Sequence, residues 1–488
     1  MEIVTFNKIN EVYLKVDCEM STLYELRDFF TFKVPGYQFS PKFKAKLWNG
    51  DIHLFDIRSR QLYVGLLTEA IKFCEDRGYK VKLENIQNAV EFSVVEAQEF
   101  IKKLKLPFEP RDYQIDAFVH AIRNRRHILV CPTGSGKSLI LYLIMSYLYQ
   151  NHKKGLLIVP TINLVEQMAK DFTSYSVNNG FDVDKMVHKI YQGKEKSTKK
   201  YLTISTWQSL QSEPTEFFED FDFFLGDECH LFSAKSLTGI ATKLTNADYR
   251  IGDTGSLDDS KCHHLVLQGL FGSIRNVTTT KKLIDANHLS DFEIKALILK
   301  HPEDKCKVLQ SNTYQEEIDY LINSESRNKF IENLALSLDG NTLVLFQLVE
   351  KHGEILYKDL ITRSPERRIF FISGKVGIDI RERIREIVEK EKNAIIVASF
   401  GTFSTGVNIR NLHNVIFASP SKSRVRNLQS IGRVLRLSDD NSVATLYDIV
   451  DDLRYKKWEN FTLKHFGVRL KLYVSEKFKH KLYKIDLK

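Results

Sequence analysis

Residues 131–138 read Cys-Pro-Thr-Gly-Ser-Gly-Lys-Ser, and this short glycine-rich segment constrains the fold more than any other part of the chain. Apolar residues precede it at 128–130, and a helix-forming run follows from Leu139 to Tyr149. This order predicts a strand, a tight loop and a helix. Gly134 and Gly136 allow backbone N–H groups to turn inward around an anion, and the helix N-terminus adds positive potential. The segment therefore predicts a phosphate-binding loop.

The side chains of this loop suit the parts of a bound nucleotide. Lys137 is long enough to reach the outer phosphates, and the Ser138 hydroxyl is an oxygen ligand suited to Mg²⁺. Cys131 stands where the eight-residue pattern begins with glycine, so the match is one residue short. A surface loop is the alternative, which the flanking strand and helix disfavour. We expect the nucleotide to contact Pro132, Thr133, Gly134, Ser135, Gly136, Lys137 and Ser138.

Length and composition set the broad class of protein. The 488 residues correspond to about three domains, and no apolar run approaches the roughly 18 residues that a membrane span requires. The six cysteines are scattered without a CxxC pair, which favours a reducing cytoplasm over a disulfide or zinc framework. The net charge of +9 attracts polyanions, nucleic acid first, although a basic protein without such a partner has the same balance.

Apolar segments alternate with helical patterns along two stretches of the chain. Strand candidates between about 105 and 290 are HILVC, GLLIVP, YLTIST, FDFFLGD and YRIGDTG. The rhythm restarts near residue 340 with NTLVLFQ, RRIFFIS, NAIIVASF, NVIFASP and SVATLYDIV. The pattern predicts two α/β domains, each a parallel sheet with helices on both faces and ligand-binding turns at the strand ends. A partly charged bridge of roughly 285–335, helical at its end, is expected to join them.

We expect three domains, with boundaries at 1–100, 101–295 and 296–488. The first is a small α+β domain that binds nucleic acid, and the second is the α/β domain that binds the nucleotide. The third is the second α/β domain, which ends in a basic tail after Asp452 rich in lysine, phenylalanine and tyrosine. That tail is either a second nucleic-acid contact or a helix that packs its aromatic residues on the domain, and the spacing favours packing.

The N-terminal domain is predicted to contain a basic hairpin. Asn49-Gly50 would form the turn between the arms KFKAKLW and DIHLFDI. Strand alternation would then place three lysines on one face and an aromatic ring at its end. Such a face suits a phosphate backbone with stacked bases, and a solvated face of an ordinary small sheet fits the pattern equally well. The residues of this expected contact are Lys42, Lys44, Lys46 and Trp48.

An acidic segment, Asp227-Glu228-Cys229-His230, follows the apolar run FDFFL. Adjacent carboxylates at a strand end suit ATP hydrolysis, in which Asp227 holds Mg²⁺ and Glu228 orients and deprotonates the attacking water. His230 could sense the γ-phosphate. An acidic loop after a strand is the alternative, and the phosphate loop upstream in the same domain favours the catalytic interpretation.

Two arginines in the second domain are the expected partners of this site. Residues 429–436 read Gln-Ser-Ile-Gly-Arg-Val-Leu-Arg, and helical spacing would place Arg433 and Arg436 on one face. Phosphoryl transfer needs cations that neutralise the charge on the γ-phosphate. If these arginines supply them, ATP binding closes the domains on each other and hydrolysis opens them. A helix with two exposed arginines is the alternative.

The order of these motifs resembles that of the superfamily 2 helicases of the DExH type, which have two RecA-like domains. The match covers about residues 105–450, in which CPTGSGKS resembles motif I, DECH motif II and QSIGRVLR motif VI. Arg111-Asp-Tyr-Gln114 resembles the adenine-recognising segment of that family. The resemblance implies an ATP hydrolase with catalytic Lys137, Asp227, Glu228, Arg433 and Arg436. It further implies nucleotide contacts from Arg111, Gln114, His230 and Gln429.

The resemblance also implies where nucleic acid binds. Residues 160–167 resemble motif Ia, residues 205–209 the strand-gripping segment before motif II, and residues 399–408 motif V. The implied contacts are Pro160, Thr161, Ser205, Thr206 and Thr402. Residues 254–256 resemble motif III, which links hydrolysis to movement, but Asp253 stands where the family favours leucine.

Within the superfamily, the chain is most similar to phage recombination helicases that act on branched DNA. The cues are the small N-terminal domain, the compact chain and the segment IGDTGSL. The resemblance implies a monomeric, ATP- and Mg²⁺-dependent helicase with 3′-to-5′ polarity in the host-cell cytoplasm. Its implied partners are DNA forks, four-way junctions and RNA–DNA hybrids.

Three other functions fit parts of the sequence. An RNA helicase shares the motifs, as does the translocating subunit of a restriction enzyme, although the chain is short for such a subunit and its flanks lack a nuclease carboxylate–lysine motif. A nucleic-acid annealing protein, in which ATP acts only as a switch, fits the basic N-terminal segment.

Overall fold

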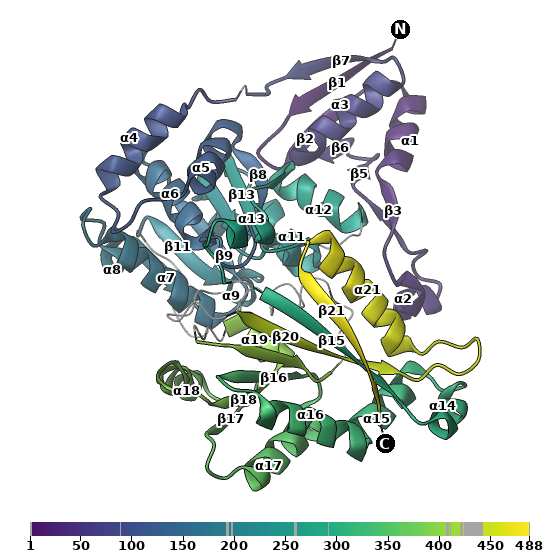
Figure 1. Ribbon diagram of the computed structural model, residues 1–488. Helices are drawn as coiled ribbons and strands as arrows, with labels where there is room; N and C mark the ends of the chain where they lie inside the picture. The colour runs from purple at the N-terminus through teal and green to yellow at the C-terminus, as the bar shows by residue number, and fades with distance from the viewer. Residues whose placement is uncertain are drawn as a thin grey trace. The chain divides into compact units, whose positions relative to one another are not determined.

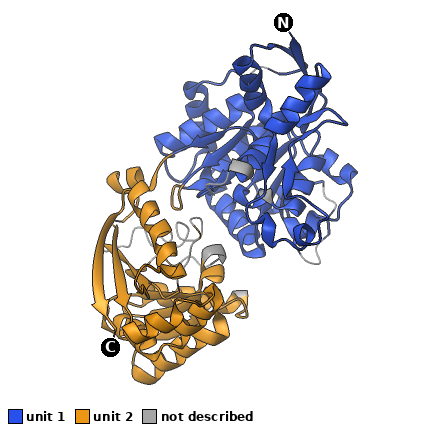
Figure 2. Ribbon diagram, turned by 90° about the vertical axis from the view of Figure 1, so that its right-hand side faces the viewer, with its two compact units in different colours: residues 1–131, 136–277 blue, residues 132–135, 278–488 orange. Residues whose placement is uncertain are grey.

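A computed structural model describes residues 2–87, 89–191, 195–196, 199–257, 261–290, 292–406, 409, 411–419, 423 and 443–487. The chain divides into two compact units, residues 1–131 with 136–277 and residues 132–135 with 278–488 (Figure 2). The first unit holds a small mixed sheet and a seven-stranded parallel sheet, and the second holds another seven-stranded parallel sheet. This arrangement confirms the predicted fold class of two RecA-like α/β domains with a small N-terminal α+β domain.

The N-terminal sheet has the strand order β5-β6-β2-β1-β7. β1 pairs antiparallel with β2 and parallel with β7. Its elements are β1 (Ile3–Lys8), β2 (Tyr13–Asp17), α1 (Met20–Phe29), β5 (Phe55–Asp56), β6 (Gln61–Tyr63), η2 (Val64–Leu66), α3 (Leu67–Asp76) and β7 (Lys80–Glu84). The apolar sides of α1 and α3 share one core with the sheet, which also contains Val4 and Phe6.

The predicted basic hairpin is wrong. Residues 37–44 form the short helices η1 (Tyr37–Phe39) and α2 (Pro41–Lys44), and β4 (Asp51–His53) pairs with β3 (Thr31–Lys33) instead. Pro41 starts α2 because its fixed φ suits a first helical turn. Lys46 has a φ of 55°, which no strand residue adopts. Gly50 has a positive φ of 89°, but it does not join two paired arms, and the three lysines do not share a strand face.

The first parallel sheet has the order β10-β11-β9-β12-β13-β8-β14. Its strands are β8 (Arg126–Val130), β9 (Gly155–Val159), β10 (Val187–Ile190), β11 (Leu202–Thr206), β12 (Phe223–Gly226), β13 (Tyr249–Thr254) and β14 (Ile274–Asn276). All five strand candidates of this stretch are confirmed. The two strands at the edges, β10 and β14, were not predicted, because each is short and carries a polar or charged residue.

Helices cover both faces of this sheet (Figure 1). They are α4 (Val94–Leu104), α5 (Asp112–Asn124), α6 (Lys137–Gln150), α7 (Ile162–Ser176), α8 (Val183–Met186), α9 (Trp207–Leu210), α10 (Thr215–Glu219), η3 (Cys229–Ser233), α11 (Lys235–Lys243) and α12 (Lys261–Phe271). Leu157 and Leu225 pack in the core around α6, whereas Leu156 and Phe224 pack in the core on the opposite face. Burial on both faces explains why the strands are almost wholly apolar.

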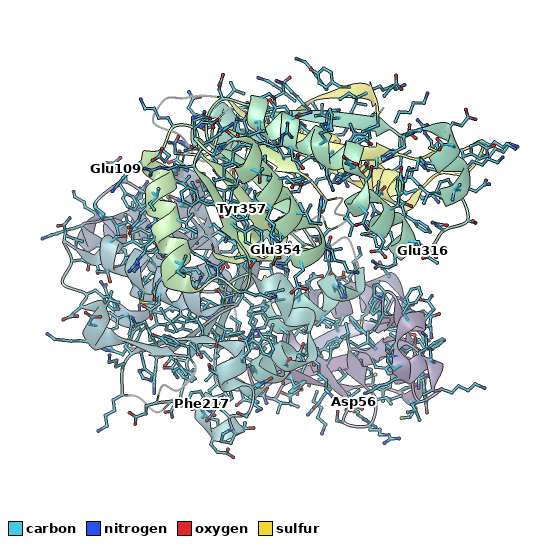
Figure 3. The ribbon with its side chains drawn as sticks, turned by 90° about the horizontal axis from the view of Figure 1, so that it is seen from below. Asp56, Glu109, Phe217, Glu316, Glu354 and Tyr357 are labelled. Carbon is cyan, nitrogen blue, oxygen red and sulfur yellow. The ribbon has the colours of Figure 1, made fainter. Side chains whose placement is uncertain are left out.

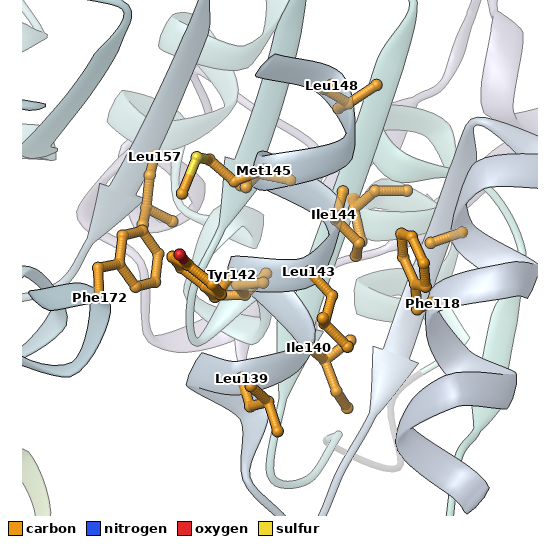
Figure 4. Close-up of a cluster of buried hydrophobic side chains, with 14 of the residues drawn as sticks. Phe118, Leu139, Ile140, Tyr142, Leu143, Ile144, Met145, Leu148, Leu157 and Phe172 are labelled. Carbon is orange, nitrogen blue, oxygen red and sulfur yellow. The ribbon is translucent and has the colours of Figure 1, made fainter. Parts of the chain in front are cut away.

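The helix that follows the phosphate loop, α6, is buried along most of its length. Figure 4 shows its side chains between those of α5, α7 and the sheet, with Tyr142 beside Phe172. A helix that is apolar all round belongs in the middle of a core. The end of the loop is therefore attached to one of the most tightly held elements of the unit.

The N-terminal domain packs directly on α12. Leu265 and Val266 of this helix belong to the core of the N-terminal sheet. A Cβ on Gly65 would lie 1.9 Å from the main-chain oxygen of Gln268, so the backbones of η2 and α12 touch. Glu11 adds an ion pair with Arg126 at the start of β8. These contacts make the N-terminal domain an integral part of the first unit.

The second parallel sheet has the order β17-β18-β16-β19-β20-β15-β21. Its strands are β15 (Phe292–Lys300), β16 (Thr342–Phe346), β17 (Ile369–Ile372), β18 (Ile395–Ser399), β19 (Asn414–Phe417), β20 (Ala444–Asp452) and β21 (Lys479–Asp486). The five strand candidates of this stretch are confirmed. The bridge expected at 285–335 is in part wrong, because β15 lies inside it and pairs with both β20 and β21.

Helices and buried ion pairs complete the second unit. Its helices are α13 (Thr280–Asp285), α14 (Glu303–Leu309), α15 (Tyr314–Asn323), α16 (Glu325–Ser337), η4 (Val349–Gly353), α17 (Glu354–Arg363), α18 (Ile378–Lys390), α19 (Phe400–Gly406) and α21 (Phe461–Ser475). Glu316, labelled in Figure 3, closes a capping box with Thr313 at the start of α15. Arg327 pairs with Asp451 at 2.8 Å, and both side chains are buried.

The C-terminal tail packs on the second domain, as the aromatic spacing favoured. Phe466, Leu472 and Tyr473 of α21 are buried, and Arg469 pairs with Asp448 of β20 at 2.9 Å. β21 then joins the edge of the sheet. Among the helices that the structure describes, none combines the length and apolar character needed to cross a bilayer.

Candidate nucleotide site and nucleic-acid groove

The glycine-rich loop connects the end of β8 to the first residue of α6. The Cys131 N–H donates to the Thr254 carbonyl oxygen at 2.8 Å, which ties the start of the loop to the end of β13. Gly134 and Gly136 have φ values of 84° and 80°, in the region that favours glycine. A Cβ on Gly136 would lie 2.3 Å from Nε2 of Gln114, so only glycine fits there. Both glycines thus have the positive φ that the sequence analysis expects of a phosphate-binding loop.

The segment predicted to recognise adenine lies against this loop. The Gln114 side chain is buried, and its Oε1 accepts a hydrogen bond from the Arg111 N–H at 2.8 Å. Arg111 donates through Nη1 to the Tyr113 hydroxyl at 2.9 Å. The start of α5 thus holds Gln114 in place beside Gly136.

Three carboxyl groups, those of Glu228, Asp253 and Asp227, act on the charge of the Lys137 ammonium. Its Nζ lies 3.4 Å from Oε1 of Glu228, and the Glu228 N–H donates to Oδ1 of Asp227 at 3.0 Å. The third carboxyl is that of Asp253, which is 2% exposed. Glu228 has a φ of 50°, a strained value for a residue with a side chain and one that often marks a functional site.

Charge and burial shift the pKa values of this cluster in different directions. Burial alone would lower the pKa of Lys137, but the charges of Glu228, Asp253 and Asp227 raise it above its ordinary value. Burial would raise the pKa of Glu228, yet Lys137 and a hydrogen bond with His230 hold it well below its usual range. Burial and the charge of Glu228 raise the pKa of Asp227, and burial with the charge of Asp227 raises that of Asp253. Such opposed shifts are typical of catalytic carboxylates.

Hydrogen bonds link the acidic segment to the end of β13. His230 Nδ1 lies 2.9 Å from Oγ1 of Thr254 and 3.3 Å from Oε2 of Glu228. The Thr254 hydroxyl also lies 2.9 Å from the carbonyl oxygen of Ser256. The segments that resemble motifs II and III therefore touch through Thr254.

Sequence reasoning missed the partner of Ser138. Its hydroxyl lies 2.8 Å from the hydroxyl of Tyr175, near the end of α7. The Tyr175 ring packs against Tyr142 and Phe108, which orients its hydroxyl. The sequence held no signal for this role, because Tyr175 and Phe172 have the helical spacing of ordinary core residues.

A groove lies at the carboxyl ends of β9, β10 and β11, with a volume of about 570 Å³. Pro160, Thr161 and Thr206, which the sequence predicts to contact nucleic acid, are among the residues that line it. Thr161 also caps α7, accepting a hydrogen bond from the Leu164 N–H. The other lining residues, which sequence reasoning missed, are Ile162, Ile190, Tyr191, Lys196, Gln208, Ser209 and Ser212.

The remaining predicted residues lie in different settings. Ser205 is buried, and its hydroxyl is bonded to the main-chain oxygens of Ile190 and Thr206, so it does not line the groove. The side chains of Lys42, Lys44 and Lys46 are exposed. Trp48 is half-buried and donates its indole N–H to the Asp51 carbonyl oxygen at 2.7 Å.

In the second unit, Thr402 belongs to the segment that resembles motif V. It lies in α19 and its Oγ1 is 2.7 Å from the Ser399 hydroxyl. Gln429, Arg433 and Arg436 lie outside the described residues. Their expected approach to the nucleotide therefore stays a prediction.

Three sequence families match parts of the chain. They are the Type III restriction enzyme res subunit family over residues 107–258, the N-terminal domain of DNA helicase UvsW over 4–84, and the helicase conserved C-terminal domain over 325–438.

Individual relatives extend these matches over almost the whole chain. The ATP-dependent DNA helicase uvsW of Enterobacteria phage T4 is 36% identical over 97% of this chain and 98% of its own length. The DNA 3′-5′ translocase XPB2 of Sulfurisphaera tokodaii is 25% identical over 78% of this chain and 89% of its own. The crystal structure of T4 UvsW, 35% identical, covers 99% of this chain and 100% of its own with a TM-score of 0.53.

Proposed function

The chain belongs to the UvsW family of ATP-dependent DNA helicases, as the small N-terminal domain, the compact chain and the segment IGDTGSL predicted, and from that premise we propose that it acts on branched nucleic acid. Its substrates in this proposal are forks, four-way junctions and R-loops formed during recombination, replication and repair. We propose 3′-to-5′ movement, which the name of the translocase from Sulfurisphaera tokodaii supports. The protein acts as a monomer in the cytoplasm of the host cell.

Within this function, the carboxylates and hydroxyl of the first unit would hold Mg²⁺ with ATP. Oxygen donors suit this ion, and Ser138 and Asp227 are the residues that would hold it. Bound Mg²⁺ would neutralise charge on the phosphates. Glu228 orients and deprotonates the attacking water, because the neighbouring Lys137 keeps its carboxylate ionised. His230 relays the state of this carboxylate to Thr254 through the hydrogen bonds described above.

Arginines of the second domain complete the proposed hydrolytic site. Arg433 and Arg436 neutralise the γ-phosphate in the transition state, and Gln429 contacts the nucleotide. Closing of the two domains would then accompany ATP binding. Loss of ATPase in Arg433→Ala with unchanged nucleotide affinity would support this role, and wild-type hydrolysis would refute it.

Nucleic acid occupies the groove at the ends of β9, β10 and β11 in this proposal, with a further contact at Thr402. Lys196, which pairs with Glu213, and Tyr191, whose hydroxyl donates to Glu166, bring a cation and an aromatic ring to the groove, which suit a phosphate and a stacked base. The three-domain division at 1–100, 101–295 and 296–488 is part of the same proposal. The first domain selects the branch, and the other two move along one strand.

The observation that carries the choice of branched substrates is the packing of the N-terminal domain, which bears the basic segment, on α12 of the first parallel-sheet domain. Lys42, Lys44 and Lys46 are exposed on a domain whose core includes residues of α12. A cationic segment on a domain that packs against a translocating domain can contact a second arm of DNA.

The test is ATPase and unwinding activity across single-stranded, duplex, fork, four-way-junction and R-loop substrates. Changing Lys42, Lys44 and Lys46 together to Gln should weaken fork binding. The slope of log binding constant against log salt concentration should become shallower by roughly 0.9 for each phosphate that is no longer neutralised. The matched control changes the exposed Lys102, Lys103 and Lys105 of the same unit. Deleting the N-terminal domain is unsuitable, because it would expose the core residues of α12.

Each outcome has a distinct meaning. Equal weakening by both triple substitutions means that net charge, not this segment, selects the substrate. Stimulation by RNA alone would identify an RNA helicase. Annealing that persists in Glu228→Gln, with no unwinding by the wild type, would identify an ATP-switched annealing protein.

A further inference from the structure

Asp253 is a buried carboxyl group, and in the part of the chain that the structure describes no N–H or hydroxyl donor lies within hydrogen-bond distance of either of its oxygens. The group within hydrogen-bonding reach is another acid, the carboxyl of Asp227. It lies at the penultimate position of β13 and is 2% exposed. A buried polar group without partners costs free energy, and an apolar residue of similar size would remove that cost. Lys137 attracts this carboxyl, but burial and the charge of Asp227 outweigh that attraction, so the fold alone does not favour an ionised aspartate at this position.

The strand pairing places Asp253 between β12, which leads to the acidic segment, and β8, which leads to the phosphate loop. Gly226 of β12 pairs with Gly252 of β13, so Asp227 and Asp253 are the next neighbours along these parallel strands. On its other side Asp253 pairs with Leu129 of β8, two residues before the phosphate loop begins.

The side chains of the two aspartates point to the same face of the sheet. Leu225 and Ile251 both pack in the core around α6, and side chains two residues apart along a strand share a face. Asp227 and Asp253 lie two residues after them, on the face where α6 begins with Lys137. The oxygens of Asp253 are thus directed toward the site itself.

The other acidic groups of the site already have partners. Glu228 lies 3.4 Å from the Lys137 ammonium, and Oδ1 of Asp227 accepts the Glu228 N–H. Among the described residues, no three or more His, Cys, Asp or Glu side chains are arranged so that they alone could bind a metal ion. Mg²⁺ commonly binds through one or two protein oxygens and keeps several waters, which need acceptors.

We propose that Asp253 is a positioning residue for the Mg²⁺–nucleotide complex, accepting hydrogen bonds from the water that surrounds the ion rather than binding it directly. This inference rests on the proposed Mg²⁺ site at Ser138 and Asp227. It extends that site by a residue that directly precedes the segment resembling motif III. Partners of this outer kind commonly change metal affinity by about 10- to 100-fold.

The experiment measures metal binding and stability, not turnover. Mn²⁺ binding in the presence of ADP is titrated by electron paramagnetic resonance for the wild type, Asp253→Asn and Asp253→Leu. Asp220→Asn, at a side chain that is 74% exposed, is the matched control. Thermal unfolding of each protein is followed without metal or nucleotide.

We expect the affinity for Mn²⁺ to fall and the thermal stability without metal to stay equal or rise. Both Asp253 variants should bind Mn²⁺ about 10- to 100-fold more weakly, and ADP affinity in EDTA should stay within about twofold of the wild type. Without metal, the midpoint of unfolding should be equal or higher, because a buried carboxyl that no donor satisfies, beside the like-charged Asp227, has been removed. Asp220→Asn should change neither quantity.

Three results would overturn the proposal in distinguishable ways. Wild-type Mn²⁺ affinity in both variants removes Asp253 from the metal site and leaves the site itself intact. Lower thermal stability of both variants without metal makes Asp253 a structural residue. Failure of the wild type to bind Mn²⁺ with ADP refutes the proposed metal site, and the inference with it.

Discussion

Replacing Lys137 by methionine tests the arrangement of the nucleotide site most directly. The change keeps the length and apolar stem of the side chain and removes its charge. Nζ lies 3.4 Å from Oε1 of Glu228, and at an effective dielectric constant of about 20 this pair alone interacts by about 5 kcal/mol. Lys137→Met thus leaves three neighbouring carboxyl groups without their cation. We expect the cluster to bind one additional proton in compensation.

The expected kinetic effect follows from the same charge. Lys137 would neutralise the γ-phosphate during hydrolysis, and loss of one such group typically lowers kcat by about 10²- to 10³-fold, or about 3–4 kcal/mol. The affinity for fork DNA without nucleotide should stay within about twofold, because the groove at β9, β10 and β11 lies outside this cluster.

The assay is steady-state ATP hydrolysis at saturating fork DNA, with DNA binding measured separately by fluorescence anisotropy. Lys153→Met is the matched control. This lysine pairs with Asp248 at 3.2 Å just beyond the other end of α6, so its loss should leave kcat unchanged. Hydrolysis by Lys137→Met at the wild-type rate would refute the assignment of the site. An equal loss in both variants would instead indicate a general effect on α6.

Three further predictions concern the stability of the fold. Burial lowers the pKa of His352 to about 3, so as pH falls below about 6.5 the unfolded state binds a proton that the folded state does not. In urea titrations the free energy of unfolding of the wild type should therefore fall with decreasing pH more steeply than that of His352→Asn, by about 1.4 kcal/mol per pH unit. Parallel slopes for the two proteins would contradict this. Arg327→Met leaves the buried Asp451 carboxylate with His301 but without its arginine. The change should cost about 3–5 kcal/mol at neutral pH by urea unfolding, and Asp451→Leu in the same chain should partly reverse that loss. Gly65→Ala places a Cβ 1.9 Å from a main-chain oxygen of α12 and should lower the free energy of unfolding by about 1–3 kcal/mol. A Cβ at Gly239 would meet no such atom of the described residues within 4 Å, so Gly239→Ala should be neutral or stabilising. Equal melting temperatures of the two variants would show that the backbones of η2 and α12 separate freely.

Local patterns in the chain determined the central strands and the phosphate loop. The apolar runs of both parallel sheets are long enough to be recognised alone, because strands buried on two faces are apolar throughout. The loop needs glycine at particular positions for its own backbone angles, a requirement that stays within eight residues. Lys137, Asp227 and Glu228 could therefore be identified from the sequence and lie together in the structure.

Edge strands and the basic segment could not be predicted in the same way. β10, β14 and β21 are short or polar, and their pairing with a distant strand stabilises them more than their own pattern does. The sequence predicts a bridge where β15 lies, because its partners β20 and β21 are more than a hundred residues away. Alternation at 42–48 suggests a strand, but Pro41 and the contact of Tyr37 with Phe43 favour helical turns.

Tertiary structure alone decided which polar groups share the nucleotide site. The sequence marks Asp253 only as an unusual residue, and strand register sets it beside Asp227, to which it is not adjacent in the chain. Tyr175 reaches Ser138 only through the packing of α7 on α6. Periodicity and motif spacing describe what a segment does by itself, whereas hydrogen bonds between distant segments depend on register and packing. For that reason the sequence determined the family and the fold class, and the structure decided the neighbours of each catalytic group.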